Sequence, residues 1–284
     1  DEISAATGNP RLSPQQAITY VGGVDATLGA ALTVQAQGFY KDLRDLVVPL
    51  PAAPLGAVYP SQALNGRYSN DGSGRAFGGE VLLRLRAFRG LAGFLAYTLS
   101  RSERRDGPAL PLHPYQYDQT HILTLVATYK LPWGLQVGLR FRYITGNPVT
   151  AVVGGVRYLP SNDYLALTGA RYGARLPDFH QLDLRIDKAW TLNRLRLGVF
   201  LDIQNIYNRR NTESILYGGW QLSQSRGVVG LPIFPDLGVR AEVHAGGSAA
   251  AYAFMLFVLD GIPYPLLVWL RRTPEQRRSI LAYA

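Results

Sequence analysis

Apolar and polar residues alternate strictly along residues 135–143 of the chain. Leu139, Phe141 and Tyr143 are separated by Arg140 and Arg142. Successive side chains of an extended chain point to opposite sides, so this alternation predicts a β-strand with one apolar and one polar face. Such a strand fits a soluble sandwich, where the apolar face packs in a core. It also fits an outer-membrane barrel, where that face meets lipid and the polar face lines a wet lumen.

The same period of two returns along most of the chain, and no convincing helical period precedes residue 244. The predicted strands cover residues 16–25, 32–37, 80–86, 92–102, 123–130, 135–145, 181–187, 195–204 and 232–243. Opposed residues of a hairpin share a face, so the pattern requires an even-length turn near 191–194 and an odd-length turn near 131–134. We therefore predict an all-β, antiparallel up-and-down meander of about nine strands.

The length of the predicted strands, the alternation of short and long loops and the positions of the aromatic residues favour the barrel. The strand patterns at 135–145 and 194–205 approach the roughly 9–11 residues that cross a bilayer at a tilt. Short and long connections alternate, as expected when one rim faces the periplasm and the other the exterior. The short ones are 87–90, 131–134 and 191–194, and the long ones are 103–117, 147–177 and 207–230. Aromatic residues near strand ends, such as Trp133 and Trp190, would form interfacial girdles. The alternative is a soluble antiparallel protein whose tyrosines are ordinary strand formers.

Composition narrows the function classes only slightly. The chain has 284 residues, no cysteine and a formal net charge of +9. The missing cysteines exclude disulfides and thiolate chemistry. Lysine and arginine are interleaved with aspartate and glutamate along the strands, which is unlike a nucleic-acid footprint, so we expect no nucleic-acid partner. The first residues show no secretory signal, so we expect a mature form or, preferably, an internal fragment.

Several short motifs occur in the order typical of one family of membrane proteins. They are NDGSGRAFGGE (70–80), LAYTLSRS (95–102), DQTH (118–121), RYITGNPVT (142–150), QLDLRIDK (181–188), DIQNIYN (202–208) and GLPIFPDLGVR (230–240). Together they closely resemble the C-terminal half of the barrel of TonB-dependent outer-membrane receptors, over residues 9–243.

The resemblance implies an integral protein of a Gram-negative type outer membrane, in contact with its lipid. The family has a 22-stranded barrel plugged by an N-terminal domain. It imports scarce ligands such as ferric siderophores, cobalamin or oligosaccharides, with energy relayed through TonB, so we expect a transporter and not an enzyme. This sequence shows neither a plug nor a TonB-contacting segment. We interpret residues 1–243 as a partial barrel that corresponds to the last nine strands. Because the first and ninth strands of a meander run the same way, nine strands closing alone would form a parallel seam.

Residues 244–284 form a different kind of segment. Nearly every residue from Ser248 to Leu270 is apolar, and arginine pairs follow at 271–272 and 277–278. The length suits a membrane-spanning helix, although Asp260 and two prolines interrupt it. We expect an apolar, basic, helical tail, and we interpret it as a non-native extension because the family's barrels usually end at an aromatic residue near Val243.

Two sets of residues are candidates for a transport path. Charged residues of the polar faces form either a structural ladder of cross-strand ion pairs or, in part, the lining of the lumen. They are Glu80, Arg84, Arg140, Arg142, Asp183, Arg185, Asp187, Arg196 and Asp202. Loop residues with aromatic or cationic ends are better candidates for ligand contact. They are Tyr115, Tyr117, Arg171, Tyr172, Arg175 and Trp220.

Other chemistry has little support in the sequence. The four histidines show no metal-ligand spacing, so we expect no metal and no cofactor. A barrel lipase or protease would need a Ser/His/acid set, which only the region of Ser102, His113 and His121 offers. A structural or adhesive barrel that relies on its long loops is the other alternative. The glycines of residues 72–79 precede a strand, so they predict a bend where the wall meets a loop, and not a phosphate cradle.

Overall fold

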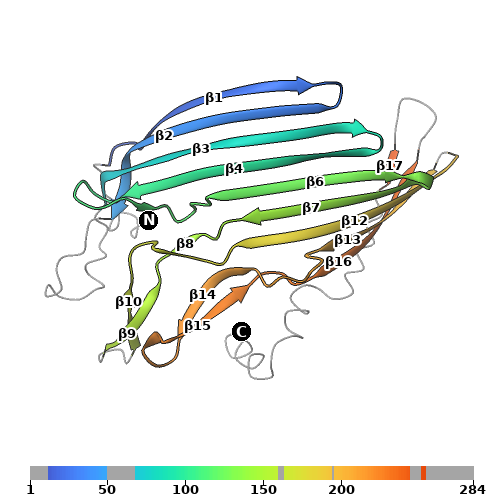
Figure 1. Cartoon of the computed structure of the whole chain (residues 1–284). Helices are drawn as coiled ribbons and strands as arrows, with labels where there is room; N and C mark the ends of the chain where they lie inside the picture. The colour runs from blue at the N-terminus through green and yellow to red at the C-terminus, as the bar shows by residue number, and fades with distance from the viewer. Residues whose placement is uncertain (1–11, 50–67, 159–162, 194, 244–250, 254–284) are drawn as a thin grey trace.

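The computed structural model describes residues 12–49, 68–158, 163–193, 195–243 and 251–253. Within them, nine long strands form one antiparallel sheet in which neighbours in sequence are neighbours in space (Figure 1). They are β1 (Gln16–Leu28), β2 (Leu32–Pro49), β3 (Tyr68–Phe88), β4 (Leu91–Arg105), β6 (His121–Leu131), β7 (Leu135–Ile144), β12 (Phe179–Leu192), β13 (Leu195–Gln204) and β16 (Phe234–Val243). The antiparallel meander of nine strands is therefore confirmed.

Short elements fill the long connections at one rim. β5 (His113–Pro114) pairs with β4, and β8 (Pro148–Val149) pairs with β11 (Ala174–Arg175). Two hairpins extend below the wall in Figure 1: β9 (Val152–Tyr158) with β10 (Asp163–Thr168), and β14 (Thr212–Gly218) with β15 (Gln224–Val229). The 3₁₀ turn η2 (Trp220–Leu222) joins the last pair. These short strands lie in loops for which the sequence pattern predicts no strand.

Tight turns occupy the opposite rim, and their lengths follow from the alternation of side chains. Phe88 pairs with Leu91 around Arg89 and Gly90, which both have positive φ, as a two-residue hairpin with a type I′ turn requires. The β6–β7 turn is the three-residue η1 (Pro132–Gly134), so its length is odd. Leu192 pairs with Leu195, so the β12–β13 turn has an even length. Both predicted parities are confirmed.

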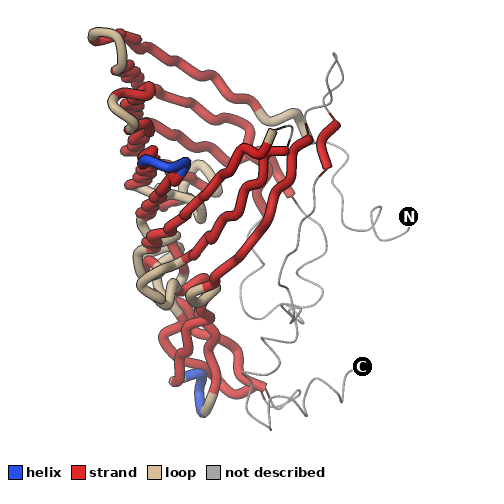
Figure 2. Tube along the Cα trace, turned by 90° about the vertical axis from the view of Figure 1, so that its right-hand side faces the viewer, coloured by secondary structure: helices blue, strands red, loops and turns tan. Residues whose placement is uncertain are grey.

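The register carries one polar and one apolar face across the sheet. Arg140 stands opposite Asp183, and Leu139 stands opposite Leu184. We define the polar face as the side of the sheet that contains the even-numbered residues of β4, β6, β7, β13 and β16. The same side contains the odd-numbered residues of β12 and the even-numbered residues between 76 and 84 of β3. The other side is the apolar face. Figure 2 shows that the sheet is a single curved layer.

A hydrophobic core of the soluble kind does not occur among the described residues. The hydrophobic side chains classed as buried there are Leu43, Val48 and Leu176. By contrast, Leu125 and Leu139 in the middle of β6 and β7 are 41% and 44% exposed. A sandwich would cover this face with a second sheet. A single layer with an uncovered apolar face is instead stable where lipid supplies the apolar phase.

One expectation from the sequence needs correction. The glycines between 72 and 79 lie inside β3 and pair with β2 and β4, so they form no bend. The irregularity lies on the partner strand, where the β2 register shifts around Asp45, which has a φ of 55°. Glycine adopts extended backbone as well as turns, so its presence alone did not distinguish the two.

The predicted helical tail lies almost entirely outside the described residues. Its three described residues form a strand, β17 (Ala251–Ala253), that pairs with Ala241, Glu242 and Val243 of β16. The physical reason is that the edge of β16 presents backbone N–H and C=O groups that an extended segment can pair with. Among the described residues, no helix has the length and apolarity needed to cross a membrane.

Candidate functional site

Arg175 ties together two loops at the rim of long connections. Its Nη1 donates to the backbone carbonyl oxygens of Asp118 at 2.6 Å and Gly146 at 2.9 Å. Its Nη2 donates to the Asp118 carboxylate and, at 3.2 Å, to Thr120 Oγ1. Asp118 is 1% exposed and also accepts a bond from the Ser102 backbone N–H. A buried carboxylate is tolerated when it is paired in this way. Arg175, a predicted ligand contact, thus holds the loops together, and a direct contact with a ligand stays a prediction.

Asp106 lies beside several cationic and aromatic side chains of the same loops. The His113 Nε2 lies 3.0 Å from Asp106 Oδ2, and Arg171 Nη1 lies 2.5 Å from the same oxygen. The ring of Tyr172 lies 5.6 Å from that of His113, between centroids. The Arg171 guanidinium is 5.6 Å from the Tyr172 ring and its side chain is 53% exposed. The structure therefore brings together two predicted ligand contacts, Arg171 and Tyr172.

Tyr115 and Tyr117 extend this group. Their rings meet edge to face with centroids 5.5 Å apart, and the Arg104 guanidinium lies 4.3 Å from the Tyr115 ring. Tyr172 Oη donates to Gln116 Oε1 at 3.3 Å, which links the two halves. Tyr117 is 65% exposed. We call the following residues the outer cluster: Asp106, His113, Tyr115, Tyr117, Arg171 and Tyr172.

Trp220 belongs to a different group. It lies in η2, is 69% exposed, and meets the Tyr164 ring of β10 edge to face at 6.0 Å. The described contacts do not join it to the outer cluster. Contact between Trp220 and a ligand stays a prediction. Such a contact would lie apart from the tyrosines of the outer cluster.

Asp178 fastens the end of the loop before β12. Its carboxylate accepts a hydrogen bond from Tyr143 Oη at 2.6 Å and one from the Gly146 backbone N–H at 3.0 Å. The Tyr143 bond first, and the Gly146 bond next, hold the pKa of Asp178 below its ordinary value, because both stabilise the ionised carboxylate. Sequence reasoning missed Asp178, since a single loop aspartate shows no local sign of a partner 35 residues away.

On the polar face, Arg140 and Asp183 join β7 to β12. Arg140 Nη2 lies 2.7 Å from Asp183 Oδ2. Asp183 is 5% exposed, and its other oxygen accepts bonds from Gln181 Nε2 at 2.6 Å and the Asn205 backbone N–H at 2.9 Å. This carboxylate therefore also holds the start of the loop that follows β13.

A second ionic group spans β12, β13 and β16. Arg185 lies 2.9 Å from Asp187 on its own strand and 3.4 Å from Asp202 across the pair. Arg196 Nη1 is 3.9 Å from Glu242 Oε2. Ion pairs that cross strands, as the predicted ladder requires, thus occur together with pairs within one strand.

The remaining candidates on this face have weaker partners. Glu80 accepts a bond from Gln37 Nε2 at 2.6 Å. Arg142 lies 5.4 Å from the Phe179 ring, and Arg84 stands opposite Phe94. The register places every charged candidate on one face, while their role as a lumen lining stays a prediction.

The region weighed as a catalytic set contains other pairings. His121 Nδ1 lies 2.9 Å from Tyr97 Oη, and Ser102 Oγ accepts a bond from Arg104 Nη1 at 3.1 Å. His113 faces a carboxylate of the outer cluster and no serine. In the part of the chain that the structure describes, no three His, Cys, Asp or Glu side chains are grouped to hold a metal ion.

A single antiparallel layer with one polar and one apolar face, short turns at one rim and long loops at the other, is the wall of a transmembrane β-barrel. A family model described as "TonB dependent receptor-like, beta-barrel" matches residues 2–206. The chain therefore belongs to the TonB-dependent receptor family, which is a family of outer-membrane barrels and not of enzymes. The resemblance found in the sequence motifs and the integral outer-membrane location are confirmed.

Solved receptor structures share the fold. The ferric-catecholate import receptor Fiu from E. coli K12 matches with a TM-score of 0.56 and 19% identity, over 84% of this chain and 29% of that one. The pyoverdine receptor FpvA from Pseudomonas aeruginosa gives 0.54 and 16%, over 83% and 30%. The ferric yersiniabactin uptake receptor FyuA from Yersinia pestis gives 0.51 and 16%, over 81% and 30%. The chain thus spans less than a third of these relatives. No curated protein matches the sequence.

Proposed function

We propose that the chain supplies part of the barrel wall of an outer-membrane active transporter that imports a ferric siderophore, with energy relayed through TonB. The family match over residues 2–206 is the observation that carries this proposal. The names of the solved structures that share the fold support the ligand class, because these proteins are receptors for ferric catecholate, pyoverdine and ferric yersiniabactin.

The outer cluster is the part of this chain that we assign to ligand capture. Exposed Tyr117 offers a ring face, and exposed Arg171 offers a cation. Flat, anionic iron chelates can stack on aromatic rings and pair with guanidinium groups. The cluster lies at the rim of long loops, where the ligand would arrive, and the polar face below it would line the path through the barrel.

Uptake of radioactive iron tests the function in the protein that carries this chain, expressed in a host without siderophore receptors. We expect saturable uptake of a ferric siderophore that stops when TonB is deleted. Uptake that persists without TonB would contradict the proposal. Correct barrel assembly without uptake of any ferric siderophore would contradict it as well. Uptake of cobalamin or an oligosaccharide in the same cells would then identify another ligand class.

Substitutions test the outer cluster separately. Tyr117→Ala and Arg171→Gln should each weaken siderophore binding about tenfold, since each removes one stacking or charge-assisted contact. Arg226→Gln, at an exposed arginine of β15 outside the cluster, is the matched control and should bind normally. Equal binding by all three variants would remove the cluster from the ligand site and leave the transport function untouched.

A further inference from the structure

Asp106 lies at the start of the loop that follows β4, and it contacts two loops at once. β4 ends at Arg105, and the two-residue strand β5 pairs back onto it, with Arg104 opposite His113. His113 Nε2 lies 3.0 Å from Asp106 Oδ2. Arg171 Nη1, from the loop between β10 and β11, lies 2.5 Å from the same oxygen. One carboxylate oxygen therefore connects the two loops that carry the outer cluster.

Arg171 depends on this carboxylate alone for its ion pair. Within the described part of the chain, its only other contact is with the Tyr172 ring, 5.6 Å from the guanidinium. The ion pair engages Nη1, whereas a guanidinium group offers five N–H donors in a planar fork. The Arg171 side chain is 53% exposed, and that of Asp106 is 15% exposed. An anion from solvent can therefore reach the guanidinium group.

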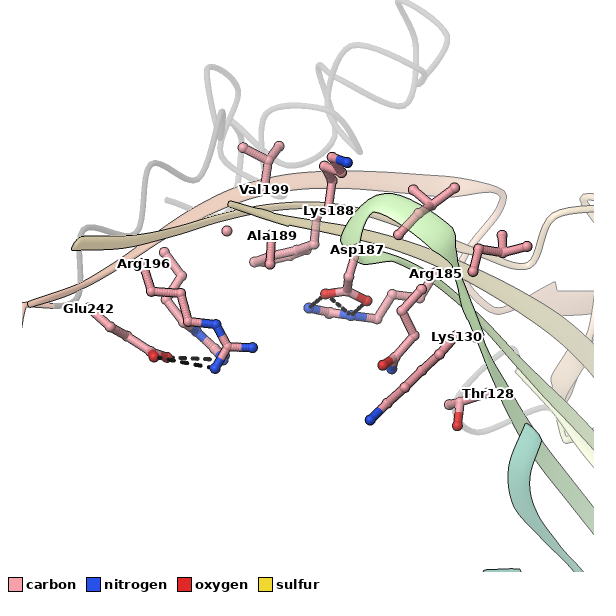
Figure 3. Close-up of a pocket in the computed structure, with 17 residues that line it drawn as sticks. Thr128, Lys130, Arg185, Asp187, Lys188, Ala189, Arg196, Val199 and Glu242 are labelled. Carbon is pink, nitrogen blue, oxygen red and sulfur yellow. Dashed lines mark hydrogen bonds and ion pairs between the residues drawn. The ribbon is translucent and has the colours of Figure 1, made fainter. Parts of the chain in front are cut away.

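Other arginines of the chain are engaged more fully. In Figure 3, which shows a pocket on the polar face, dashed lines join Arg185 to Asp187. Asp202 lies 3.4 Å from Arg185 as a second carboxylate. Arg175 is bound by a buried carboxylate and three further oxygens. Among the described residues, Arg171 has neither a second carboxylate nor a backbone acceptor, so its ion pair is the most readily replaced of the three.

Asp106 keeps a partner if another anion takes Arg171. His113 also lies between β4 and β6, and its Nε2 stays beside the Asp106 carboxylate. The other ring nitrogen, Nδ1, faces the carbonyl oxygen of Pro114 at 2.9 Å. Two acceptors around one ring suit the imidazolium form, in which both nitrogens donate. An exchange of anions on Arg171 therefore does not leave the Asp106 carboxylate alone in a half-buried place, which would be costly.

A tight turn fixes the position of Arg171 before a ligand arrives. The next residue, Tyr172, has a φ of 51°, in the left-handed region, and its N–H donates to Thr150 Oγ1 at 3.0 Å. The Gly173 N–H donates to the carbonyl oxygen of Ala170 at 2.9 Å, which closes the turn. A group held in this way loses little freedom on binding. A ligand and Asp106 therefore compete for the guanidinium at one place.

We propose that Asp106 is a specificity-determining residue of the ligand site. It occupies Arg171 as an internal anion, and the anionic group of a ligand has to displace it. Because an exposed ion pair is weak, a ligand that brings several negative groups can replace it, whereas an uncharged ligand cannot. The inference rests on the proposed function, because it deepens the ligand site assigned to the outer cluster. It adds a selection for anionic chelates over uncharged ones.

Two arginine-modifying reagents test this selection on the purified protein that carries this chain. Phenylglyoxal is uncharged, and hydroxynitrophenylglyoxal is its anionic counterpart. Peptide mass mapping locates and quantifies the adducts of both reagents. Asp106→Asn keeps the shape of the side chain and removes its charge. We expect the ratio of anionic to uncharged labelling at Arg171 to rise about two- to fivefold in this variant, since one exposed ion pair is lost. The ratio at exposed Arg226, measured in the same digest, should not change.

Glu213→Gln is the matched control, because it removes an exposed carboxylate of β14 outside the outer cluster. This variant should leave the ratio at Arg171 as it is in the unaltered protein. Three results would overturn the inference. An unchanged ratio in Asp106→Asn would show that Asp106 does not control the access of anions. Equal gains for both reagents would indicate only a loosened turn. A rise of the same size in Glu213→Gln would assign the effect to the general charge of the loops.

The labelling test requires no siderophore, so it is independent of transport. If labelling responds as expected but no ferric siderophore is taken up, the proposed function fails and the control of Arg171 by Asp106 remains. If uptake is normal and the two reagents respond alike, only the inference about Asp106 fails.

Discussion

Arg140 on β7 and Asp183 on β12 are opposed across the strand pair, with Nη2 and Oδ2 2.7 Å apart. The carboxylate also receives the backbone N–H of Asn205, where the chain leaves β13. One side chain therefore joins two strands, β7 and β12, to the beginning of the loop that follows β13.

Replacing Asp183 with alanine should destabilise the wall. The change leaves the Arg140 guanidinium and the Asn205 N–H without their acceptor, which costs on the order of 1–3 kcal/mol for each group that stays out of water. The urea midpoint of the reconstituted protein measures this loss. Asp187→Ala is the control, because the Asp187 side chain is 35% exposed and should cost much less. Equal urea midpoints for the two variants would show that the burial of Asp183 makes it no more important for stability than the more exposed Asp187.

Charge on the apolar face should block assembly, and loss of charge on the polar face should not. Leu139→Arg places a guanidinium in lipid near the middle of β7, at a cost of about 2–4 kcal/mol. Arg142→Leu, on the polar face of the same strand, should assemble in nearly normal amounts, because Arg142 lies beside the Phe179 ring and its loss leaves no buried carboxylate of the described residues without its cation. The fraction that migrates as folded barrel before heating gives the comparison. Similar tolerance of both changes would argue against the assignment of lipid to the apolar face.

Acid should loosen the loop held by Asp178. Its pKa is lower in the folded protein than the ordinary 3.8, so it contributes stability that is fully present above the ordinary value. That contribution is lost as the pH falls through the folded value. Tyr143→Phe removes the largest cause of the lowered pKa and should move the onset of loosening to higher pH. Amide exchange at Gly146, measured from pH 6 downwards, follows it. An unchanged profile in Tyr143→Phe would refute this account.

Arg175→Ala should release the loop that Arg175 holds, and Arg175→Lys should release it as well. The guanidinium reaches acceptors on Asp118, Gly146 and Thr120 at once, and an ammonium group cannot match that planar fork. Loss of the only partner of a buried carboxylate costs about 3–5 kcal/mol. Asp118 keeps Arg101, whose Nη1 lies 3.5 Å from its Oδ2, so the loss here should be smaller than that. Limited proteolysis of the loop between β7 and β12 should therefore be faster in both variants. Arg171→Lys, at the more exposed arginine, is the control and should resist proteolysis as well as the unaltered protein does.

The strands could be predicted because their signal is local. The alternation along β7 or β13 can be recognised from neighbouring residues alone. Because Leu184 and Ile203 lie opposite each other on the same face, only a turn with an even number of residues can connect their strands. Motif order then identified the family. The match of nine predicted and nine observed long strands reflects this local encoding.

The candidate site was less predictable because its contacts join distant residues. Arg175 and Asp118 are 57 positions apart, and nothing near either residue marks the other. Aromatic and cationic loop residues were recognisable as candidates by type. Their division into the outer cluster, the separate Trp220 group and the structural tie at Arg175 depends on how the loops fold over one another.

The apolar face has no protein partner among the described residues, and we propose that the bilayer acts as the second layer of this fold. In that arrangement, lipid acyl chains do for Leu125 and Leu139 what neighbouring side chains do in a soluble core. Changing acyl-chain length is then equivalent to a core mutation applied to every strand at once. Shorter chains would uncover the ends of the apolar rows, and the stability of the wall becomes a property of the membrane as much as of the sequence.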